Sequence, residues 1–254
     1  MANLSITARN LGAPEQAKTQ ALIAMLPERK TLPQSFKALD IALNGTISKT
    51  LKQGDFTGLA GSHRWLPGAG NVQRVLLIGC GDPGKMSVAT AKKISESLAK
   101  TLVGSAANDA LITFSGLNRK IGSCRQLIEQ ISLQLSLAHY QYGHTLNQRK
   151  KPPRSLKRVT IAAGDTCSIS DARRAVLAGT ATGQGANLTR ELVNLPGNIC
   201  TPKYLASEAR RLARKTKNIS ASVLGERQMA ELGMQSLLSV GKGSDQQSQL
   251  IVMK

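Results

Sequence analysis

The chain has 254 residues, and its 34 Lys and Arg against 15 Asp and Glu give a formal net charge of +19. This length is sufficient for one large domain or two smaller ones, each with its own core. No apolar run reaches the roughly 18 residues of a membrane-spanning helix, and Met1–Ile6 lacks the basic and apolar regions of an export signal. From the sequence we therefore expect no membrane span, and the N-terminus argues against export.

Strands and helices alternate through the first two thirds of the chain. Arg74–Gly79 is the clearest strand, a continuous apolar run typical of strands covered on both faces. In chain order the predicted elements are strand Leu4–Ala8, strand Ala21–Leu26 (with a short helix as the alternative), helix Phe36–Leu43, strand Arg74–Gly79, helix Met86–Val103, strand Asp109–Phe114, helix Cys124–Tyr142 and strand Val159–Ala163. This order predicts an α/β fold with a mixed, mostly parallel sheet flanked by helices.

A long helix is predicted next, capped by Asp171 and running to about Val193. Its small residues fall on two stripes, which are Ala172, Ala175, Gly179, Thr182 and Ala186, and beside them Ala178, Ala181 and Gly185. Small side chains on two sides allow other elements to approach closely. The pattern predicts a helix wedged between two bodies.

The sequence next predicts the end of this helix, a tight turn and the start of a second helix. Pro196 cannot continue a helix, and Gly197–Asn198 tolerates the left-handed geometry of a turn. Thr201 can cap the next helix, with Pro202 at its first position. The elements predicted beyond this turn are a helix with the apolar stripe Leu205, Ala209, Leu212 and Ala213, strand Ser220–Leu224, helix Glu226–Leu232 closed by Gly233, and strand Gln249–Lys254.

This region also carries a family resemblance. The motifs are N-L-T-R-E-L-V-N-L-P-G-N at Asn187–Asn198, T-P-K-Y-L-A at Thr201–Ala206, E-L-G-M-Q-S-L-L-S-V-G-K-G-S at Glu231–Ser244, and the apolar strand Leu250–Met253. In this order they resemble the leucyl aminopeptidase (cytosol aminopeptidase) family. Weaker similarity reaches back to Gly54–Gly58 and Val75–Gly81, so that the resemblance covers most of the chain.

The resemblance implies a domain plan and an activity. Residues 1–168 are expected to form a macro-domain-like α/β domain, 169–195 a linking helix, and 196–254 the start of an incomplete catalytic domain. Family members remove N-terminal amino acids from peptides as hexamers, using two divalent metal ions, manganese or zinc, that polarise the carbonyl and supply a bound hydroxide. The family's metal ligands and catalytic residues follow the last strand matched here. We therefore expect no catalytic residue, no metal ligand and no activity in this chain alone.

Two glycine-containing motifs suggest other sites. Gly79–Gly84 reads G-C-G-D-P-G between a strand and a helix, the context of a dinucleotide fingerprint, but Pro83 removes an N–H and no acidic residue closes the next strand. A plain glycine turn is the preferred interpretation. Val240–Gly243 reads V-G-K-G, like the start of the family's metal motif, yet no aspartate-glycine-glycine follows. Lys242 is therefore expected to be an exposed turn lysine.

Histidines and cysteines show no catalytic or metal-binding pattern. His63, His139 and His144 lack an H-E-x-x-H motif and a close acidic partner in sequence, and the last two are expected to interact with the dipole at a helix end. Cys80, Cys124, Cys167 and Cys200 form no C-x-x-C pair. Scattered thiols suit a reducing compartment, and we expect a cytoplasmic protein.

The positive charge leaves a second function open. Two clusters could contact phosphates: Arg149, Lys150, Lys151, Arg154, Lys157 and Arg158 in one segment, and Arg210, Arg211 and Arg214 on one helix face. A solvated connecting loop is the preferred interpretation of the first cluster, and an acidic remainder of a longer protein could balance the overall charge. Only 3% of residues are aromatic, which weakens base-stacking modes. The alternatives to a peptidase are thus a basic DNA-binding module or a non-catalytic oligomer-assembly domain.

Overall fold

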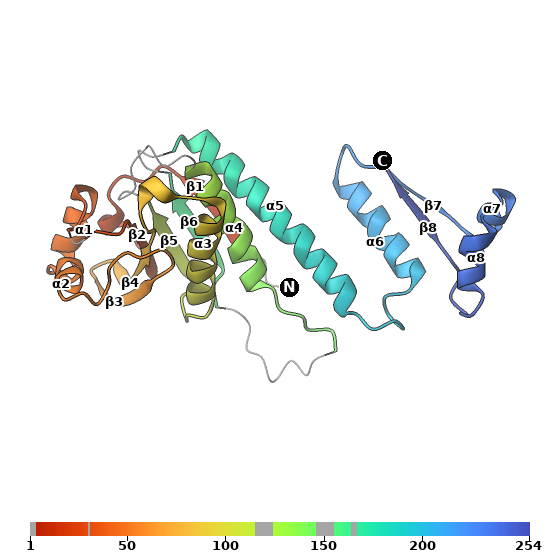
Figure 1. The fold of residues 1–254 in the computed structure, drawn as a ribbon, viewed down its shortest axis with the longest axis horizontal. Coiled ribbons are helices and arrows are strands. Elements are labelled where there is room, and N and C mark those ends of the chain that lie inside the picture. Colours follow the sequence, from red (N-terminus) through yellow and green to blue (C-terminus); the bar gives the residue numbers. More distant parts are fainter. Residues whose placement is uncertain (1–3, 30, 115–123, 146–154, 164–166) are drawn as a thin grey trace. The chain divides into compact units, whose positions relative to one another are not determined.

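The computed structural model describes residues 4–29, 31–114, 124–145, 155–163 and 167–254. Contacts divide the chain into two compact units. The N-terminal unit comprises Met1–Gln141 and Asn147–Asn187, and the C-terminal unit comprises Tyr142–Leu146 and Leu188–Lys254. Each unit is described by itself (Figure 1). No helix in the described ranges has the length and hydrophobicity needed to cross a lipid bilayer.

A six-stranded sheet organises the N-terminal unit, in the order β1-β6-β5-β2-β4-β3. Its strands are β1 Ser5–Arg9, β2 Ala21–Leu26, β3 His63–Ala69, β4 Val72–Gly79, β5 Asp109–Thr113 and β6 Arg158–Ala162. All neighbouring strands are parallel except β3, which pairs antiparallel with β4. The predicted mixed, mostly parallel α/β sheet is confirmed, and Ala21–Leu26 is a strand rather than a short helix.

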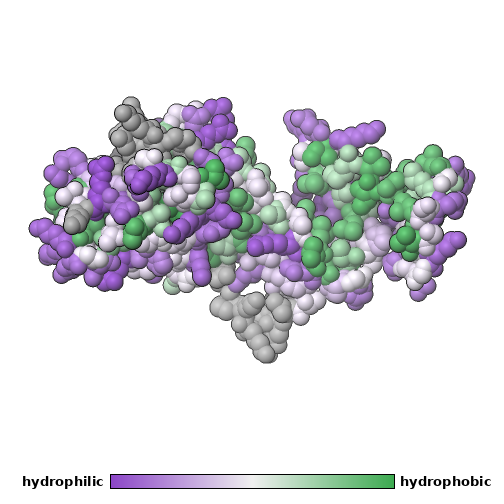
Figure 2. All heavy atoms as spheres, viewed as in Figure 1, coloured by the Kyte–Doolittle hydropathy of each residue, from purple (hydrophilic) through white to green (hydrophobic). Residues whose placement is uncertain are grey.

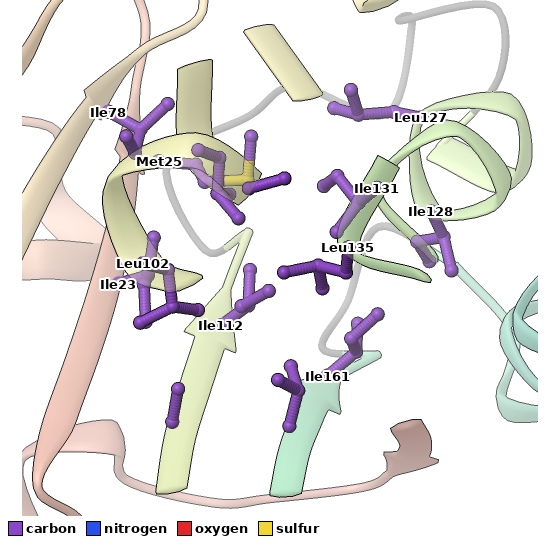
Figure 3. Close-up of a cluster of buried hydrophobic side chains, with 14 of the residues drawn as sticks. Ile23, Met25, Ile78, Leu102, Ile112, Leu127, Ile128, Ile131, Leu135 and Ile161 are labelled. Atoms are coloured by element: carbon purple, nitrogen blue, oxygen red, sulfur yellow. The ribbon is translucent and has the colours of Figure 1, made fainter. Parts of the chain in front are cut away.

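The central strand β2 is buried along its whole length, which explains its continuous apolar sequence. Because successive side chains point to opposite faces, β2 contributes to a core on each side of the sheet. On one face Ile23 and Met25 lie in a cluster with α3 (Val88–Val103) and α4 (Cys124–His139), as Figure 3 shows. Burying a side chain of this size contributes about 1.5–3 kcal/mol.

Two short helices, α1 (Lys37–Ala42) and α2 (Thr46–Lys52), supply the core on the other face. Asn44 and Gly45 lie between the two helices with positive φ angles of 55° and 73°, which confirms that the predicted helix ends at this pair. Asp40 fixes the second helix, since its Oδ1 accepts hydrogen bonds from the backbone N–H groups of Ile47 (2.9 Å) and Ser48 (3.1 Å). Three one-turn 3-10 helices, Pro14–Gln16, Gln34–Phe36 and Pro83–Lys85, complete the described part.

The long helix α5 extends over Ile169–Asn194. Its predicted cap is wrong by one turn: Ser168 Oγ accepts the Asp171 N–H (3.1 Å), and Asp171 lies inside the first turn, where its carboxylate accepts from the Ser168 hydroxyl (2.7 Å). A serine hydroxyl at the cap position and an acidic residue three positions later can bond to each other reciprocally. The cap residue of α5 is therefore Ser168, and Asp171 supports it from within the first turn.

The small residues of α5 pack closely on one side. Gly179 and Gly183 lie so near α4 that a Cβ on either would approach Glu129 O (2.2 Å) or Ser136 Cβ (2.5 Å). The second stripe is not covered in this way, because Ala181 and Gly185 are exposed. The boundary between the two contact-defined units falls within α5, between Asn187 and Leu188. The domain limits at residues 168 and 195 stay a prediction.

The predicted turn lies within the C-terminal unit and leads into its next helix. Thr201 caps α6 (Pro202–Lys215) by accepting the Tyr204 N–H (3.3 Å), with Pro202 in the first turn, so that the predicted restart is confirmed. The remaining elements are β7 Ala221–Leu224, α7 Glu226–Glu231, α8 Gln235–Gly241 and β8 Leu250–Met253. Gly233, at φ 74°, ends α7. The strands β7 and β8 form an antiparallel pair, and α8 was not predicted.

Candidate functional site

Ionisable side chains gather in the C-terminal unit where α5 ends and α6 begins. The side chain of Glu191 is buried, and its Oε1 lies 2.9 Å from Nε2 of the half-exposed His144. Burial raises the pKa of the Tyr204 hydroxyl, and the nearby Glu208, Cys200 and Glu191 raise it further. The contact between His144 and Glu191 joins the segment 142–145 to the end of α5, although the two residues lie far apart in sequence.

The described residues do not fit a two-metal centre. No group of three or more His, Cys, Asp or Glu side chains that could hold a metal ion occurs among them. In the polar cluster, Glu208 is engaged by Arg211, whose Nε lies 2.9 Å from Oε2, and Glu191 is paired with His144. The contacts of this cluster are pairs between ionisable side chains, Arg211 with Glu208 and His144 with Glu191.

The three histidines have partners that their sequence neighbourhood did not indicate. His63 lies on β3 with Nδ1 3.3 Å from Ser97 Oγ. His139 is the last residue of α4, as expected, and its Nε2 lies 2.9 Å from the Leu156 carbonyl oxygen. The expectation for His144 is wrong, because α4 ends before it and its partner is the carboxylate of Glu191 rather than a helix end.

The glycines of the Gly79–Gly84 loop have a packing reason. A Cβ on Gly79 would lie 2.0 Å from the Leu59 carbonyl oxygen, and Gly81 has a positive φ of 68°. Asp82 accepts the Gly84 N–H (2.8 Å) and caps the one-turn 3-10 helix that follows. These contacts support the interpretation of the motif as a glycine turn.

Lys242 is exposed and directly follows α8, at its C-terminal cap position. The Val240-Gly241 part of the V-G-K-G motif forms the last turn of this helix rather than a loop around a ligand. The geometry therefore agrees with the expectation of a surface lysine. A cation at this end of a helix interacts favourably with the free carbonyl groups.

The two predicted basic clusters belong to different units. Arg149, Lys150, Lys151 and Arg154 lie outside the described residues. Lys157 and Arg158 are exposed at the start of β6, where both backbone N–H groups donate to the Asn108 carbonyl oxygen. In the C-terminal unit Arg210, Arg211 and Arg214 are exposed on α6. Glu208 pairs with Arg211 and raises the pKa of its guanidinium, and the negative charge of the Glu208 carboxylate offsets part of the positive charge of this face.

Two separate parts of the sequence match two domain models of one family. The model of the cytosol aminopeptidase family N-terminal domain matches residues 22–149, and the model of the family's catalytic domain matches residues 187–254. The chain belongs to the cytosol aminopeptidase family. The resemblance drawn from the motifs between Asn187 and Met253 is thereby confirmed.

Curated relatives of the cytosol aminopeptidase family align with almost the whole chain. A probable cytosol aminopeptidase of Nitrosococcus oceani is 35% identical over 246 residues, which are 96% of this chain and 49% of the relative. That of Pseudomonas syringae pv. tomato is 36% identical over 247 residues, 95% of this chain and 49% of the relative. The chain thus spans about half the length of the curated relatives it matches.

Solved structures agree on the α/β fold. A mutant of tomato leucine aminopeptidase superposes with a TM-score of 0.77 at 23% identity, covering 99% of this chain and 50% of that chain. The bottromycin maturation enzyme BotP gives 0.69 at 20% identity, covering 92% and 45%. A complex of BotP with Mn gives 0.65 at 22% identity, covering 93% of this chain and 45% of that chain. At such identities the likeness supports the fold alone.

Proposed function

We propose that this chain provides the N-terminal domain and the opening part of the catalytic domain of an aminopeptidase that releases N-terminal amino acids from peptides. The observation that carries the proposal is the order and continuity of the match. Both family domain models align in the family order, and the aligned relatives, named as probable cytosol aminopeptidases, cover up to 96% of the chain.

The chain's part in this function is structural. Its described residues contain no cluster fit for a metal ion, so we assign it no catalytic residue and no step of hydrolysis. What it contributes is the buried sheet of the N-terminal unit and the capped turn into α6, which lies within the part that matches the family's catalytic domain. We therefore expect no turnover of leucine p-nitroanilide by this chain alone, with or without added manganese or zinc.

A chimera tests the proposal. The aligned half of the Nitrosococcus oceani relative is replaced by this chain, and hydrolysis of leucine p-nitroanilide is compared with that of the unaltered relative under the same metal conditions. We expect activity within about 10-fold of the parent, because the relative's own second half is retained and only the scaffold changes. A chimera that folds, shown by a cooperative thermal transition, yet has no activity would contradict the proposal. Turnover by this chain alone would contradict the structural role.

Assembly is a separate part of the proposal. The resemblance implies a hexamer, and light scattering of the chimera, compared with the unaltered relative, measures it. A monomeric chimera beside an oligomeric parent would show that this chain lacks the assembly contacts. The DNA-binding alternative depends on the basic clusters, and a gel shift at low salt that is lost steeply with added salt would favour it.

A further inference from the structure

The helices α4 and α5 lie side by side in the N-terminal unit and run in the same direction (Figure 1). A Cβ on Gly179 of α5 would lie 2.9 Å from Ser132 Cβ of α4. One turn further along both helices, a Cβ on Gly183 would lie 2.5 Å from Ser136 Cβ. Because the contacts advance together along the two helices, α4 and α5 begin at the same end of the pair.

Two cysteines lie together at that end. Cys124 is the first residue of α4, and Cys167 directly precedes Ser168, whose hydroxyl caps α5. Burial raises the pKa of the Cys167 thiol, and a hydrogen bond with the side chain of Cys124 opposes that rise. The two sulfur atoms are therefore within hydrogen-bond distance of each other, although the residues are far apart in sequence.

The charged residues beside the thiols also interact from one helix start to the other. The Ser168 hydroxyl and the Arg174 guanidinium lower the pKa of Asp171, and the positive charge of Arg125 on α4 lowers it further. The carboxylate of Asp171 in turn adds to the rise in the pKa of Cys167. Charges on the first turns of α4 and α5 are thus close enough to influence one another, which agrees with the proximity of the thiols.

The surroundings of this thiol pair differ from those of the other two cysteines. Cys124 and Cys167 are partly buried and pack against the core of the N-terminal unit. Cys80 is completely buried within that core, and Cys200 belongs to the C-terminal unit. Of the four cysteines, all of which lie in the described ranges, Cys124 and Cys167 combine a neighbouring thiol with partial access to solvent.

Disulfide formation is the reaction that this pair supports. A structural zinc site takes four ligands, and no group of three or more His, Cys, Asp or Glu side chains suited to a metal ion occurs among the described residues. Two adjacent thiols, by contrast, contain everything on the protein side that an intramolecular disulfide requires. In reducing compartments, disulfides of this kind are typically transient and respond to a change in redox conditions.

We propose that Cys124 and Cys167 are a reversible redox pair, which is reduced under reducing conditions and forms a disulfide joining the starts of α4 and α5 when the surroundings become oxidising. The oxidant is a small disulfide such as oxidised glutathione. One cysteine thiolate attacks a sulfur of the oxidant and releases one reduced glutathione, and the second cysteine thiolate attacks the resulting mixed disulfide and releases the other. One S–S bond of the oxidant and two protein S–H bonds are thereby replaced by one protein S–S bond and two glutathione S–H bonds.

Charge around the pair favours an anionic oxidant of this class. Arg125 follows Cys124 directly, Arg173 lies near the start of α5, and both arginines are exposed. Glutathione carries carboxylates and is attracted by such a positive field. Hydrophilic residues also cover most of the visible face of the N-terminal unit in Figure 2, which suits the approach of a charged, water-soluble reagent.

The disulfide would act on the helix that extends from one unit into the other. The boundary between the units lies within α5, and Cys167 directly precedes its cap residue. A bond between residues 124 and 167 closes a long loop and restricts the unfolded chain more than the folded one. We therefore expect oxidation to raise the Tm by roughly 4–12 °C. This inference does not depend on the proposed function, because it concerns no step of peptide hydrolysis.

Oxidation of the purified protein tests the inference. The protein is incubated with oxidised glutathione at neutral pH and digested without reduction, and its peptides are identified by mass spectrometry. We expect a linked pair of peptides that contain Cys124 and Cys167, a raised Tm, and the return of both changes to their starting values after addition of dithiothreitol. Cys80 is expected to stay unmodified because it is buried.

Variants and an equilibrium measurement locate the bond. Cys124→Ser and Cys167→Ser should each abolish the linked peptides and the rise in Tm, whereas the matched control Cys200→Ser should retain both. A second measurement uses the original protein alone, so it does not depend on how well a variant folds. The concentration of reduced glutathione that reduces half of the disulfide should be at least about 10-fold higher in the native protein than in urea, because the native fold holds the thiols together.

Three results would overturn the inference. One is the attachment of glutathione to Cys124 and Cys167 without a bond between them. Another is a disulfide that includes Cys80 or Cys200, or that joins two molecules, in place of the expected pair. The third is a disulfide between Cys124 and Cys167 that lowers the Tm or forms only in urea, since either outcome would mean that the native fold does not hold the thiols in position to react.

Discussion

The contact between α4 and α5 leads to a sharp prediction about Gly179. In this helix pair an added Cβ at position 179 would lie 2.2 Å from the Glu129 carbonyl oxygen and 2.9 Å from Ser132 Cβ. The oxygen belongs to the backbone of α4 and cannot rotate away as a side chain would. The change Gly179→Ala therefore forces the two helices apart or strains the backbone of one of them.

Two effects of opposite sign determine the magnitude. Alanine in a helix interior is more favourable than glycine by about 1 kcal/mol. Overpacking by one methyl group in a well-packed core costs about 1–3 kcal/mol, and a contact with rigid backbone belongs at the upper end. We therefore expect Gly179→Ala to lower the free energy of unfolding by about 1–2 kcal/mol. For a chain of this size that corresponds to a fall in Tm of roughly 2–8 °C.

Gly185 provides a matched control in the same helix. A Cβ at this position would have no atom within 4 Å, so Gly185→Ala gains the helix preference without a clash. We expect an increase of about 0.5–1 kcal/mol in the free energy of unfolding. Urea unfolding followed by circular dichroism measures both variants. If Gly179→Ala is as stable as the original protein or more stable, the close packing of α4 on α5 is wrong.

Three further predictions concern a cap, a carboxyl group and a thiol. Thr201→Ala removes a helix cap and is expected to cost about 1 kcal/mol in urea unfolding, whereas Thr201→Ser keeps the hydroxyl and should stay within a few tenths. The Ser168 hydroxyl and the Arg174 guanidinium lower the pKa of Asp171, so their stabilisation is present at neutral pH and is lost as the pH falls through that lowered pKa. Ser168→Ala should raise this pKa in an NMR titration, and an unchanged value would contradict the cap. Burial raises the pKa of the Cys80 thiol, so this thiol should react with a disulfide reagent at pH 8 only after unfolding, and rapid labelling of Cys80 in the native protein would count against its burial.

Local patterns were sufficient to predict most of the N-terminal unit. Continuous apolar runs such as Arg74–Gly79 correspond to strands buried in the sheet, because a strand covered on both faces tolerates few polar residues. Helix ends at Gly45, Pro196 and Gly233 were predicted, since the conformational limits of glycine and proline act locally.

Elements and contacts that depend on distant partners were missed. The strand β3 contains Pro67 and Gly68, residues that lower strand propensity, and its pairing with β4 at the edge of the sheet determines its conformation. The pair formed by His144 and Glu191 gives no signal in sequence, because nothing local brings the two side chains together. The motifs around Asn187–Asn198 located the family, yet they could not reveal which polar side chains of the C-terminal unit contact one another.

The contrast between β2 and β8 shows what an apolar strand pattern measures. Ala21–Leu26 and Leu250–Met253 are both continuous apolar runs, but the first is buried throughout while the second is not buried at any position. An apolar run indicates a strand that is stable when apolar side chains cover both of its faces. The structure shows how much of that cover the described residues provide. For β2 the two coincide. For β8 they differ, since the described residues leave its apolar side chains only partly covered and pair it with β7 alone.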